Sequence, residues 1–260
     1  MGRVNRVNSQ YLYVRVAEHI LDKIESKELQ PGAQLDSERS LSAKLGVNRL
    51  TVRKGIEMLV NQGVLYRVPS KGTFVAGPKI DQRMDLVLGF SDQLISKGLQ
   101  PGAEVLEVSV VPATKKISRQ LKIDVGTPMY YIQRIRYANS EAVCIEHNYY
   151  PTTICPGMDK QDLRQSIYKI FREKYDLSIQ YARQTLEAVA PTKDEAELLH
   201  ISTHTPLMLL VRVGFDSNGH PVEYAKELYR GDRCRFVILG DCPEGEAPPR
   251  EAFVTMNFER

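Results

Sequence analysis

The sequence predicts an α+β fold in which a small helical domain ending in a β-hairpin precedes a larger domain built on an antiparallel sheet. Apolar residues recur at helical spacing in the first 60 residues, and after residue 103 the strand patterns come in pairs joined by short turns. The chain has 260 residues, of which 42% are hydrophobic and 26% charged. This length and composition are typical of a globular protein with two domains.

The N-terminal domain begins with an amphipathic helix that ends before the turn Leu29-Gln30-Pro31-Gly32. The apolar residues that we expect on its inward face are Val16, Ile20, Leu21 and Ile24. A second helix should run from Ser37 to Leu45, with apolar residues at Leu41 and Leu45. Gly46 should close it, because glycine readily adopts the left-handed conformation at a helix C-terminus.

A third helix and a hairpin complete this domain. Asn48 can cap the helix by accepting a hydrogen bond from the backbone N–H of Thr51. Two strands, 64–68 and 73–75, should follow, joined by Pro69-Ser70-Lys71-Gly72. Helix, turn, helix and hairpin in this order predict a winged helix-turn-helix, which binds DNA. The buried stripe of the third helix should consist of Val52, Ile56, Leu59 and Val60.

The third helix carries the candidate base contacts. Arg49 and Arg53 are four residues apart and share a helix face, and a guanidinium group matches guanine O6 and N7 in the major groove. Leu50 lies off the buried stripe and could contact a thymine methyl group. An isolated arginine pair is as often a solvated face, so the order of the elements is what favours DNA binding. Including expected contacts to phosphates and to the minor groove, the predicted DNA-binding residues are Arg39, Asn48, Arg49, Leu50, Thr51, Arg53, Ser70, Lys71 and Gly72.

This domain resembles the DNA-binding domain of the GntR family of bacterial transcription regulators over about residues 11–75. The family motifs appear as Ser37-Glu38-Arg39, Arg49-Leu50-Thr51-Val52-Arg53 and Lys71-Gly72-Thr73-Phe74-Val75. Asp36 stands where a proline is usual, and Ser70 stands where the wing tip usually has glycine. The change at the wing implies a shallower approach to the minor groove.

Charge is distributed unevenly along the chain. Residues 1–80 contain 13 Lys and Arg against 7 Asp and Glu, a net charge of +6, whereas residues 81–260 contain 22 against 25, a net charge of −3. This asymmetry is expected if the N-terminal part binds DNA phosphates and the remainder does not.

Several other classes of protein and site are disfavoured. No apolar run approaches the length of a membrane span, and the start of the chain lacks the apolar core of a signal peptide, so we expect a cytoplasmic protein with no membrane partner. His200 and His204 have the spacing of helical metal ligands, but Pro206 opposes a helix there, and we expect no metal and no cofactor. No Cys-x-x-Cys pair occurs, which favours reduced structural thiols at Cys144, Cys155, Cys234 and Cys242.

We divide the chain into a winged helix-turn-helix domain at 9–76, a linker without periodicity at 77–84, a second domain at 85–239 and a loosely ordered C-terminal extension at 240–260. The second domain should contain hairpins interrupted by short helices, and Thr192 to Glu195 form a capping box at the start of one of them. The predicted helices are 86–95, 115–121, 167–175 and a short one after Thr192. The predicted strands are 105–111, 129–137, 143–150, 179–189, 207–215 and 222–228.

The second domain resembles the UTRA effector-binding domain of the HutC subfamily of GntR regulators, whose sheet topology is similar to that of chorismate lyase. Arg134 and Arg136 are two residues apart on one strand and so share a face, where they could hold a phosphate or carboxylate. The alternative is the polar side of a half-exposed strand. His147 should face away from such a site. The effector-binding residues that the resemblance implies are Phe90, Ser91, Arg134, Arg136, Glu146, Tyr149, Ser166, Tyr168, Glu223 and Tyr229.

Together these patterns predict a ligand-responsive transcription regulator, a repressor that binds a pseudo-palindromic operator in double-stranded DNA as a homodimer and is released by a small anionic metabolite. That effector would belong to the phosphorylated sugars, amino acids or organic acids. One alternative is an enzyme with chorismate-lyase-like activity, which the complete DNA-binding head disfavours. Another is a GntR protein with an all-helical second domain, which the alternating strands oppose. We expect no enzymatic activity and no catalytic residues.

Overall fold

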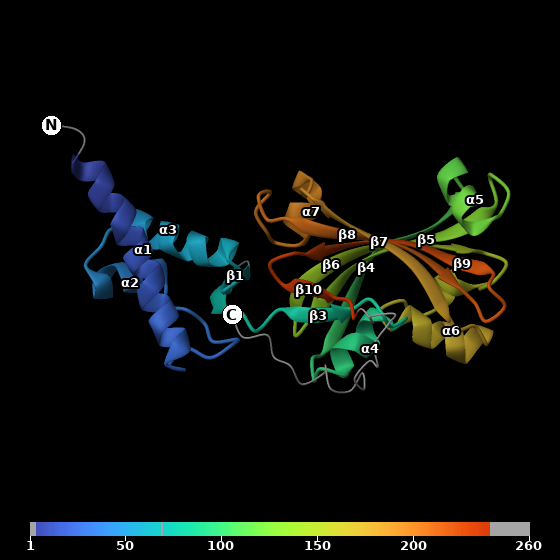
Figure 1. The fold of residues 1–260 in the computed structure, drawn as a ribbon, viewed down its shortest axis with the longest axis horizontal. Coiled ribbons are helices and arrows are strands. Elements are labelled where there is room, and N and C mark those ends of the chain that lie inside the picture. The colour runs from blue at the N-terminus through green and yellow to red at the C-terminus, as the bar shows by residue number, and fades with distance from the viewer. Residues whose placement is uncertain (1–3, 69, 240–260) are drawn as a thin grey trace, which may run out of the picture.

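A computed structural model describes residues 4–68 and 70–239; for residues 4–11 it describes the backbone only. Two domains lie side by side along the long axis of the molecule (Figure 1). The α+β prediction, with a helical N-terminal domain and an antiparallel C-terminal sheet, is confirmed. The predicted extension at 240–260, including Cys242, lies outside the described residues. None of the described helices is both long and apolar enough to cross a membrane.

The N-terminal domain packs three helices and a hairpin around one small core. Its elements are α1 (Val4–Glu25), α2 (Glu38–Leu45), α3 (Arg49–Asn61), β1 (Leu65–Val68) and β2 (Gly72–Val75). Residues from all three helices are buried together, and the inward face predicted for α1 is correct at Val16 and Ile20. On α3 the predicted stripe is buried at Val52, Ile56 and Leu59, whereas Val60 is only partly buried.

The predicted helix ends in this domain are confirmed. The Ser37 hydroxyl accepts from the backbone N–H of Ser40 at the start of α2, and Gly46 closes that helix with φ 65°. The Asn48 Oδ1 atom accepts from the N–H of Thr51 at 2.8 Å and caps α3. These caps fix the turn between the two helices and therefore the direction in which α3 points.

Ser70 at the wing tip has φ 60°, a left-handed conformation that suits glycine better than serine. We expect Ser70→Gly to raise the unfolding free energy of the N-terminal domain by about 0.5–1 kcal/mol, since it removes this strain. Denaturant titration would measure the change. Ser40→Gly within α2 is the control, where glycine should instead lower stability. A loss of stability in Ser70→Gly would show that the serine side chain contributes more than its backbone strain costs.

The segment predicted to be an irregular linker is a strand. β3 (Ile80–Arg83) pairs in parallel with β10 (Cys234–Val237), which the sequence did not predict. Both strands are only four residues long, too short for period-two alternation to stand out. The connection between the domains is thus tied to the end of the second domain (Figure 1).

The second domain is built on a six-stranded sheet in the order β4-β5-β6-β9-β8-β7, in which all neighbours are antiparallel. The predicted hairpins are present, and the turn between β5 and β6 uses Asn139 and Ser140, both with positive φ. The strands are β4 (Pro101–Pro112), β5 (Pro128–Ala138), β6 (Glu141–Pro151), β7 (Tyr181–Val189), β8 (Leu207–Phe215) and β9 (Pro221–Arg230).

Helices cover both faces of this sheet. We call the face that carries α4 (Phe90–Ile95) and α6 (Ile167–Tyr175) the inner face, and the face that carries α5 (Lys115–Leu121) and α7 (Lys193–Leu198) the outer face (Figure 1). The prediction of a helix at 86–95 was wrong for its first residues, because α4 begins only after Gly89. A short 3-10 helix, Met158–Lys160, was not predicted, whereas the capping box at Thr192 is confirmed.

Candidate DNA-binding surface and effector pocket

The first turn of α3 presents the most exposed candidate contacts to DNA. The Arg49 side chain is 62% exposed, and Leu50 is 68% exposed, an unusual position for a leucine in a helix whose next turn is buried. Both residues point away from the core, as a base-contacting face requires. Around them, Arg39, Ser70, Lys71 and Gly72 are also exposed.

Arg53 on the same helix is held by a carboxylate of α2. Its Nε and Nη2 atoms donate to the two oxygens of Glu38 at 3.0 and 2.8 Å, and the nearest nitrogen of Arg49 lies 4.0 Å from the same group. The hydrogen bond from Arg53 lowers the pKa of Glu38. Arg53 therefore has half of its guanidinium occupied, and Arg49 is the freer of the two arginines.

Two predicted DNA contacts are used inside the protein. Thr51 is 6% exposed and lies at the buried side of α3, which opposes the predicted contact of this residue with a phosphate. Its position between the exposed Leu50 and the buried Val52 did not reveal on which side of the helix it would fall. Asn48 is at the surface, but its Oδ1 atom is engaged in the helix cap.

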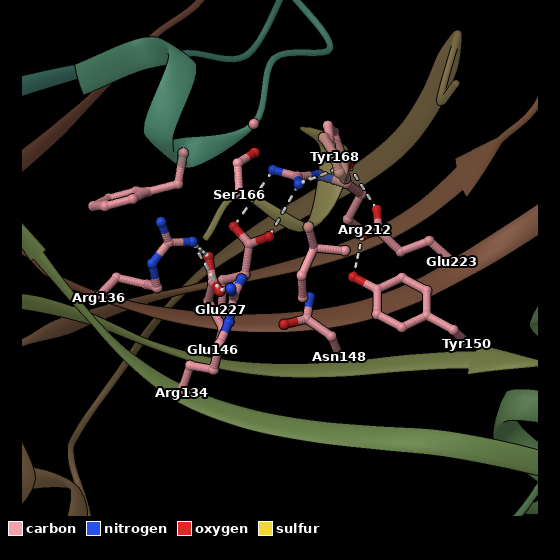
Figure 2. A pocket seen from close by; sticks show the side chains of 13 residues that line it. Arg134, Arg136, Glu146, Asn148, Tyr150, Ser166, Tyr168, Arg212, Glu223 and Glu227 are labelled. Carbon is pink, nitrogen blue, oxygen red and sulfur yellow. Dashed lines mark hydrogen bonds and ion pairs between the residues drawn. The ribbon is translucent and has the colours of Figure 1, made fainter. Parts of the chain in front are cut away.

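A cluster of buried charges occupies the inner face of the sheet beneath α4 and α6. Strand register places Glu146 on β6 between Arg134 on β5 and Glu227 on β9, and Arg212 projects from β8 into the same layer (Figure 2). All four side chains are at most about one-tenth exposed. We call this layer the inner-face cluster. Together with neighbouring residues described below, it comprises Arg134, Arg136, Glu146, Asn148, Tyr150, Tyr168, Arg212, Glu223 and Glu227.

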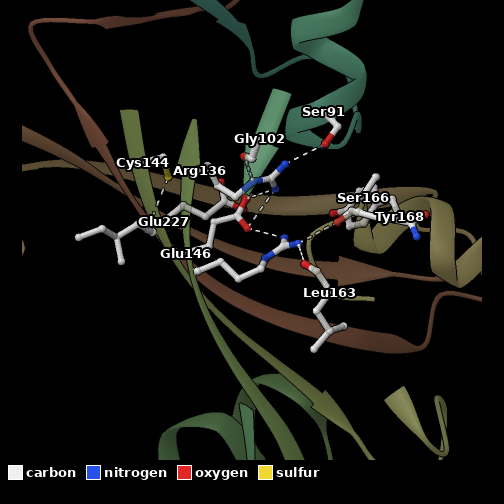
Figure 3. A network of polar contacts seen from close by, with 12 residues as sticks. Ser91, Gly102, Arg136, Cys144, Glu146, Leu163, Ser166, Tyr168 and Glu227 are labelled. Carbon is white, nitrogen blue, oxygen red and sulfur yellow. Dashed lines mark hydrogen bonds and ion pairs between the residues drawn. The ribbon is translucent and has the colours of Figure 1, made fainter. Parts of the chain in front are cut away.

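At one end of the cluster, Glu146 binds both predicted arginines. Arg134 Nη2 lies 2.5 Å from Glu146 Oε2 (Figure 2). Arg136 Nη1 lies 3.0 Å from Glu146 Oε1 (Figure 3). Arg134 also donates to the carbonyl oxygens of Leu163 and Gln165, and Arg136 donates to the Ser91 hydroxyl at 2.8 Å. Burial raises the pKa of Glu146, but the two arginines lower it further, so the net shift is downward.

At the other end, Glu223 accepts hydrogen bonds from two tyrosines. Tyr150 and Tyr168 donate to its two oxygens at 3.1 and 2.8 Å. Arg212 forms an ion pair with Glu227 at 3.0 Å and donates to the Tyr168 hydroxyl at 3.2 Å (Figure 2). Burial raises the pKa values of Glu223 and Glu227, although Arg212 opposes the shift.

The cavity inside the cluster is small. Its free volume is about 20 Å³, which is room for roughly one water molecule. Two of the residues that line it have a buried polar atom without a hydrogen-bond partner among the described residues, namely Asn148 Oδ1 and Arg134 Nε. An unpaired acceptor and an unpaired donor, both buried, favour a polar guest at this position.

Comparisons with known proteins agree with both halves of the fold. The model of the bacterial regulatory proteins of the gntR family matches residues 12–75, and the model of the UTRA domain matches residues 96–235. The chain is 32% identical over 238 residues to the HTH-type transcriptional repressor NagR of Bacillus subtilis (strain 168), covering 92% of this chain and 98% of that protein. The chain belongs to the GntR family.

Other GntR regulators show comparable similarity. The probable fructoselysine utilization operon transcriptional repressor of Escherichia coli (strain K12) is 30% identical over 92% of this chain and 98% of its own. The crystal structure of PhnF from Mycobacterium smegmatis matches with a TM-score of 0.62 and 27% identity, covering 86% of this chain and 96% of that chain. The protein is thus a DNA-binding transcription regulator whose second domain is a UTRA domain.

Most effector-binding residues that the GntR resemblance implied lie together in the structure. The cavity is lined by seven of them: Phe90, Arg134, Arg136, Glu146, Ser166, Tyr168 and Glu223. Ser91, on α4, accepts a hydrogen bond from Arg136. Tyr229 lies on the same face and donates to Glu227. Tyr149 was predicted wrongly: it lies on the outer face, against Tyr131 and Tyr224, because it is an odd number of residues from Glu146.

Four cluster residues were not predicted from the sequence, namely Asn148, Tyr150, Arg212 and Glu227. Period-two alternation could have found three of them. Asn148 and Tyr150 follow Glu146 at even spacing, and Glu227 lies at even spacing between Glu223 and Tyr229. Arg212 is the lone charge in the apolar strand β8, which is itself a signal of a buried partner.

His147 lies on the outer face, as alternation predicts, with its Nδ1 atom 2.9 Å from the Tyr131 hydroxyl. Burial and nearby Lys226 lower the pKa of this histidine below its ordinary value.

Because the pKa of His147 is lowered by folding, the unfolded chain binds a proton more readily than the folded one. The contribution of neutral His147 to the unfolding free energy is therefore present above about pH 6.5 and is lost as the pH falls through the lowered pKa. We expect His147→Gln to lose less unfolding free energy than the wild type between about pH 8 and pH 5.5 in denaturant titrations. Equal losses would show that His147 does not contribute to acid sensitivity.

Proposed function

We propose that this regulator is a repressor that binds a pseudo-palindromic operator as a homodimer and is released when a small anionic metabolite enters the inner-face cluster. The observation that carries the proposal is the pairing of an exposed recognition helix with a buried polar site in a separate domain. Such a site has no structural need for three arginines and three glutamates, because well-packed apolar residues stabilise a domain at least as well.

For DNA binding, we propose Arg49 and Arg53 as base contacts, Leu50 as a contact to a thymine methyl group, and Arg39 and Lys71 as contacts to the backbone and minor groove. Asn48, Ser70 and Gly72 stay in this set through their exposed backbone and polar atoms, whereas Thr51 leaves it. Glu38 restrains Arg53 in the absence of DNA. Glu38 can also accept from a cytosine amino group, a pairing that acidic side chains make in the major groove.

For the effector, we propose a sugar-derived molecule with a phosphate or carboxylate group. An anion suits Arg134, Arg136 and Ser91, which lie at the Glu146 end of the cluster. Ser166 and Tyr168 line the same cavity and add hydroxyl groups. Hydroxyl groups of a sugar could donate to the carboxylates and to Asn148 Oδ1 at the other end. Two relatives are named for systems that use fructoselysine and mannosyl-D-glycerate, both of them sugar derivatives, which supports this class.

The size of the cavity implies that the effector binds to a second, more open arrangement. Ligand sites for small organic molecules occupy about 300–1,000 Å³, whereas the present cavity holds about 20 Å³. An entering anion must compete with Glu146 for the two arginines, since both are ion-paired to it. Binding therefore separates contacts that now close the cluster, and only a ligand with different affinity for the two arrangements can change DNA binding.

The operator prediction can be tested by selection from random DNA, with no target gene specified. Random duplexes selected on the purified protein should yield two inverted half-sites, and sedimentation should show two chains on each duplex, because one recognition helix contacts too few base pairs for specificity. A monomer bound to a single half-site at full affinity would contradict the homodimer. Thermal shift against phosphorylated sugars, amino acids and organic acids then tests the effector class, since a ligand specific for the folded state raises the Tm.

A further inference from the structure

Two buried or half-buried glutamine side chains hold the end of the interdomain strand β3. Gln93 Oε1 on α4 accepts from the backbone N–H of Arg83 at 3.0 Å, and Gln184 Nε2 on β7 donates to the carbonyl oxygen of Met84 at 3.2 Å. These bonds come from two elements that are far apart in the sequence, and they hold two consecutive residues. We call Gln93 and Gln184 the amide clamp.

Each glutamine of the amide clamp is linked to the inner-face cluster. Gln184 Oε1 accepts from Arg212 Nε at 3.2 Å, so one amide group joins the cluster arginine to the Met84 backbone. Gln93 lies on the same short helix as Ser91 and Phe90. Ser91 accepts from Arg136, and the Arg136 guanidinium lies 4.6 Å from the centre of the Phe90 ring.

On its far side, β3 is connected to the DNA-binding domain. Arg233, directly before β10, donates to the carbonyl oxygen of Gly77 at 3.0 Å and lies 5.9 Å from the centre of the Tyr66 ring in the wing. Lys79 donates to the carbonyl oxygen of Gly231 at 2.6 Å. Gly63, in the turn before β1, is so close to the backbone of Asp232 that an added Cβ atom would lie 2.6 Å from its carbonyl oxygen. A displacement of β3 or β10 must therefore move the wing.

The strand itself shows a feature of an element with a second arrangement. Gln82 in β3 is 2% exposed, and neither its Nε2 nor its Oε1 atom has a hydrogen-bond partner among the described residues. A buried amide without partners costs free energy that another position of the strand can recover.

We propose that the amide clamp transmits the state of the inner-face cluster to β3, which makes Gln93 and Gln184 positioning residues for the switch between operator binding and release. The inference rests on the proposed function and deepens it. A ligand that attracts Arg212 removes the hydrogen bond that Arg212 donates to Gln184. A ligand that attracts Arg136 displaces α4, which Arg136 contacts through Ser91. Because the Gln184 amide is rigid and planar, loss of the Arg212 bond at its oxygen also turns the nitrogen that holds Met84. Coupling then follows from a shared element that both sites bias.

A double-mutant cycle on operator affinity tests the clamp without any ligand. Tyr168→Phe removes one hydroxyl from the cluster, where it bonds Glu223 and Arg212, and Gln184→Met keeps the side-chain length but removes both amide bonds. We expect Tyr168→Phe to change operator affinity at least about threefold in the wild type and to have no effect in the Gln184→Met background. Gln133→Met, on the outer face of β5, is the matched control and should leave the Tyr168→Phe effect intact. Independent, multiplying effects of Tyr168→Phe and Gln184→Met would overturn the proposal, and so would no effect of Tyr168→Phe in the wild type.

A second measurement separates this inference from the proposed function. Operator affinity is measured with and without glucose 6-phosphate in the wild type, Gln93→Met and Gln184→Met, and sugar phosphate binding is followed by calorimetry. We expect the clamp variants to bind the sugar phosphate within about threefold of the wild type and to lose at least about tenfold of its effect on operator affinity. Equal release of all three proteins would overturn the clamp and leave the proposed function standing. No binding to any protein, together with a positive mutant cycle, would exclude glucose 6-phosphate as the effector and leave the clamp standing.

Discussion

Arg134→Ala should lower the free energy of unfolding of the second domain by about 3–5 kcal/mol, because it leaves the buried Glu146 without one of its two partners. Denaturant titration followed by circular dichroism would measure this loss. Replacement of the whole group, Arg134→Met with Arg136→Leu and Glu146→Met, should recover much of the stability, since no uncompensated charge then remains. An unchanged midpoint in Arg134→Ala would show that water reaches Glu146 and that the cluster is not closed.

The control for this experiment is Arg164→Ala, which removes an ion pair with Asp162 at the surface of the same domain. We expect little change there, since exposed ion pairs are screened by solvent. The contrast also affects how the effector site must be tested. An alanine at Arg134 or Arg136 loses effector response through unfolding as well as through lost contacts. Ser166→Ala is the milder variant, because it removes one hydroxyl and the N-cap bond of α6 but leaves the buried charges paired.

Arg49→Ala should weaken binding to the specific operator by about 1–3 kcal/mol while weakening binding to scrambled DNA far less, because a bidentate contact to a guanine edge carries sequence information. Fluorescence anisotropy on both duplexes at one salt concentration would measure the difference. Arg119→Ala, an exposed arginine on α5 in the other domain, is the control for lost positive charge. Equal losses on both duplexes would identify Arg49 as a phosphate contact.

Much of the N-terminal domain could be predicted from the sequence because its determinants are local. Helix caps at Ser37, Gly46 and Asn48 act within four residues of the chain, and apolar spacing fixes the buried face of α3. The same holds for the hairpin turn at Asn139 and Ser140. The boundaries of α5 and α6 were also predicted correctly.

Other misses are consequences of tertiary contacts, unlike Tyr149, Asn148, Tyr150 and Glu227, whose faces follow from alternation along a strand. β3 and β10 are strands only because they find each other, 154 residues apart. Residues 86–89, the first part of the helix predicted at 86–95, are not helical. Apolar spacing alone cannot distinguish a helix from an irregular segment with apolar residues. At the proposed effector site, the sequence predicted Arg134 and Arg136 but could not show that Glu146 forms ion pairs with both of them. That neutralisation depends on the register between β5 and β6, which shifts between Arg136 and Tyr137.

Under the proposed function, the closed inner-face cluster determines which effector concentration the regulator responds to. When only a fraction of the molecules is open, the apparent Kd for the effector equals the intrinsic Kd divided by that fraction. A population that is about 1% open thus needs a hundredfold more metabolite than an open pocket would. Closure thus sets a concentration threshold, below which the effector leaves transcription repressed. Substitutions that loosen the contacts closing the cluster should shift the effector concentration at which transcription begins.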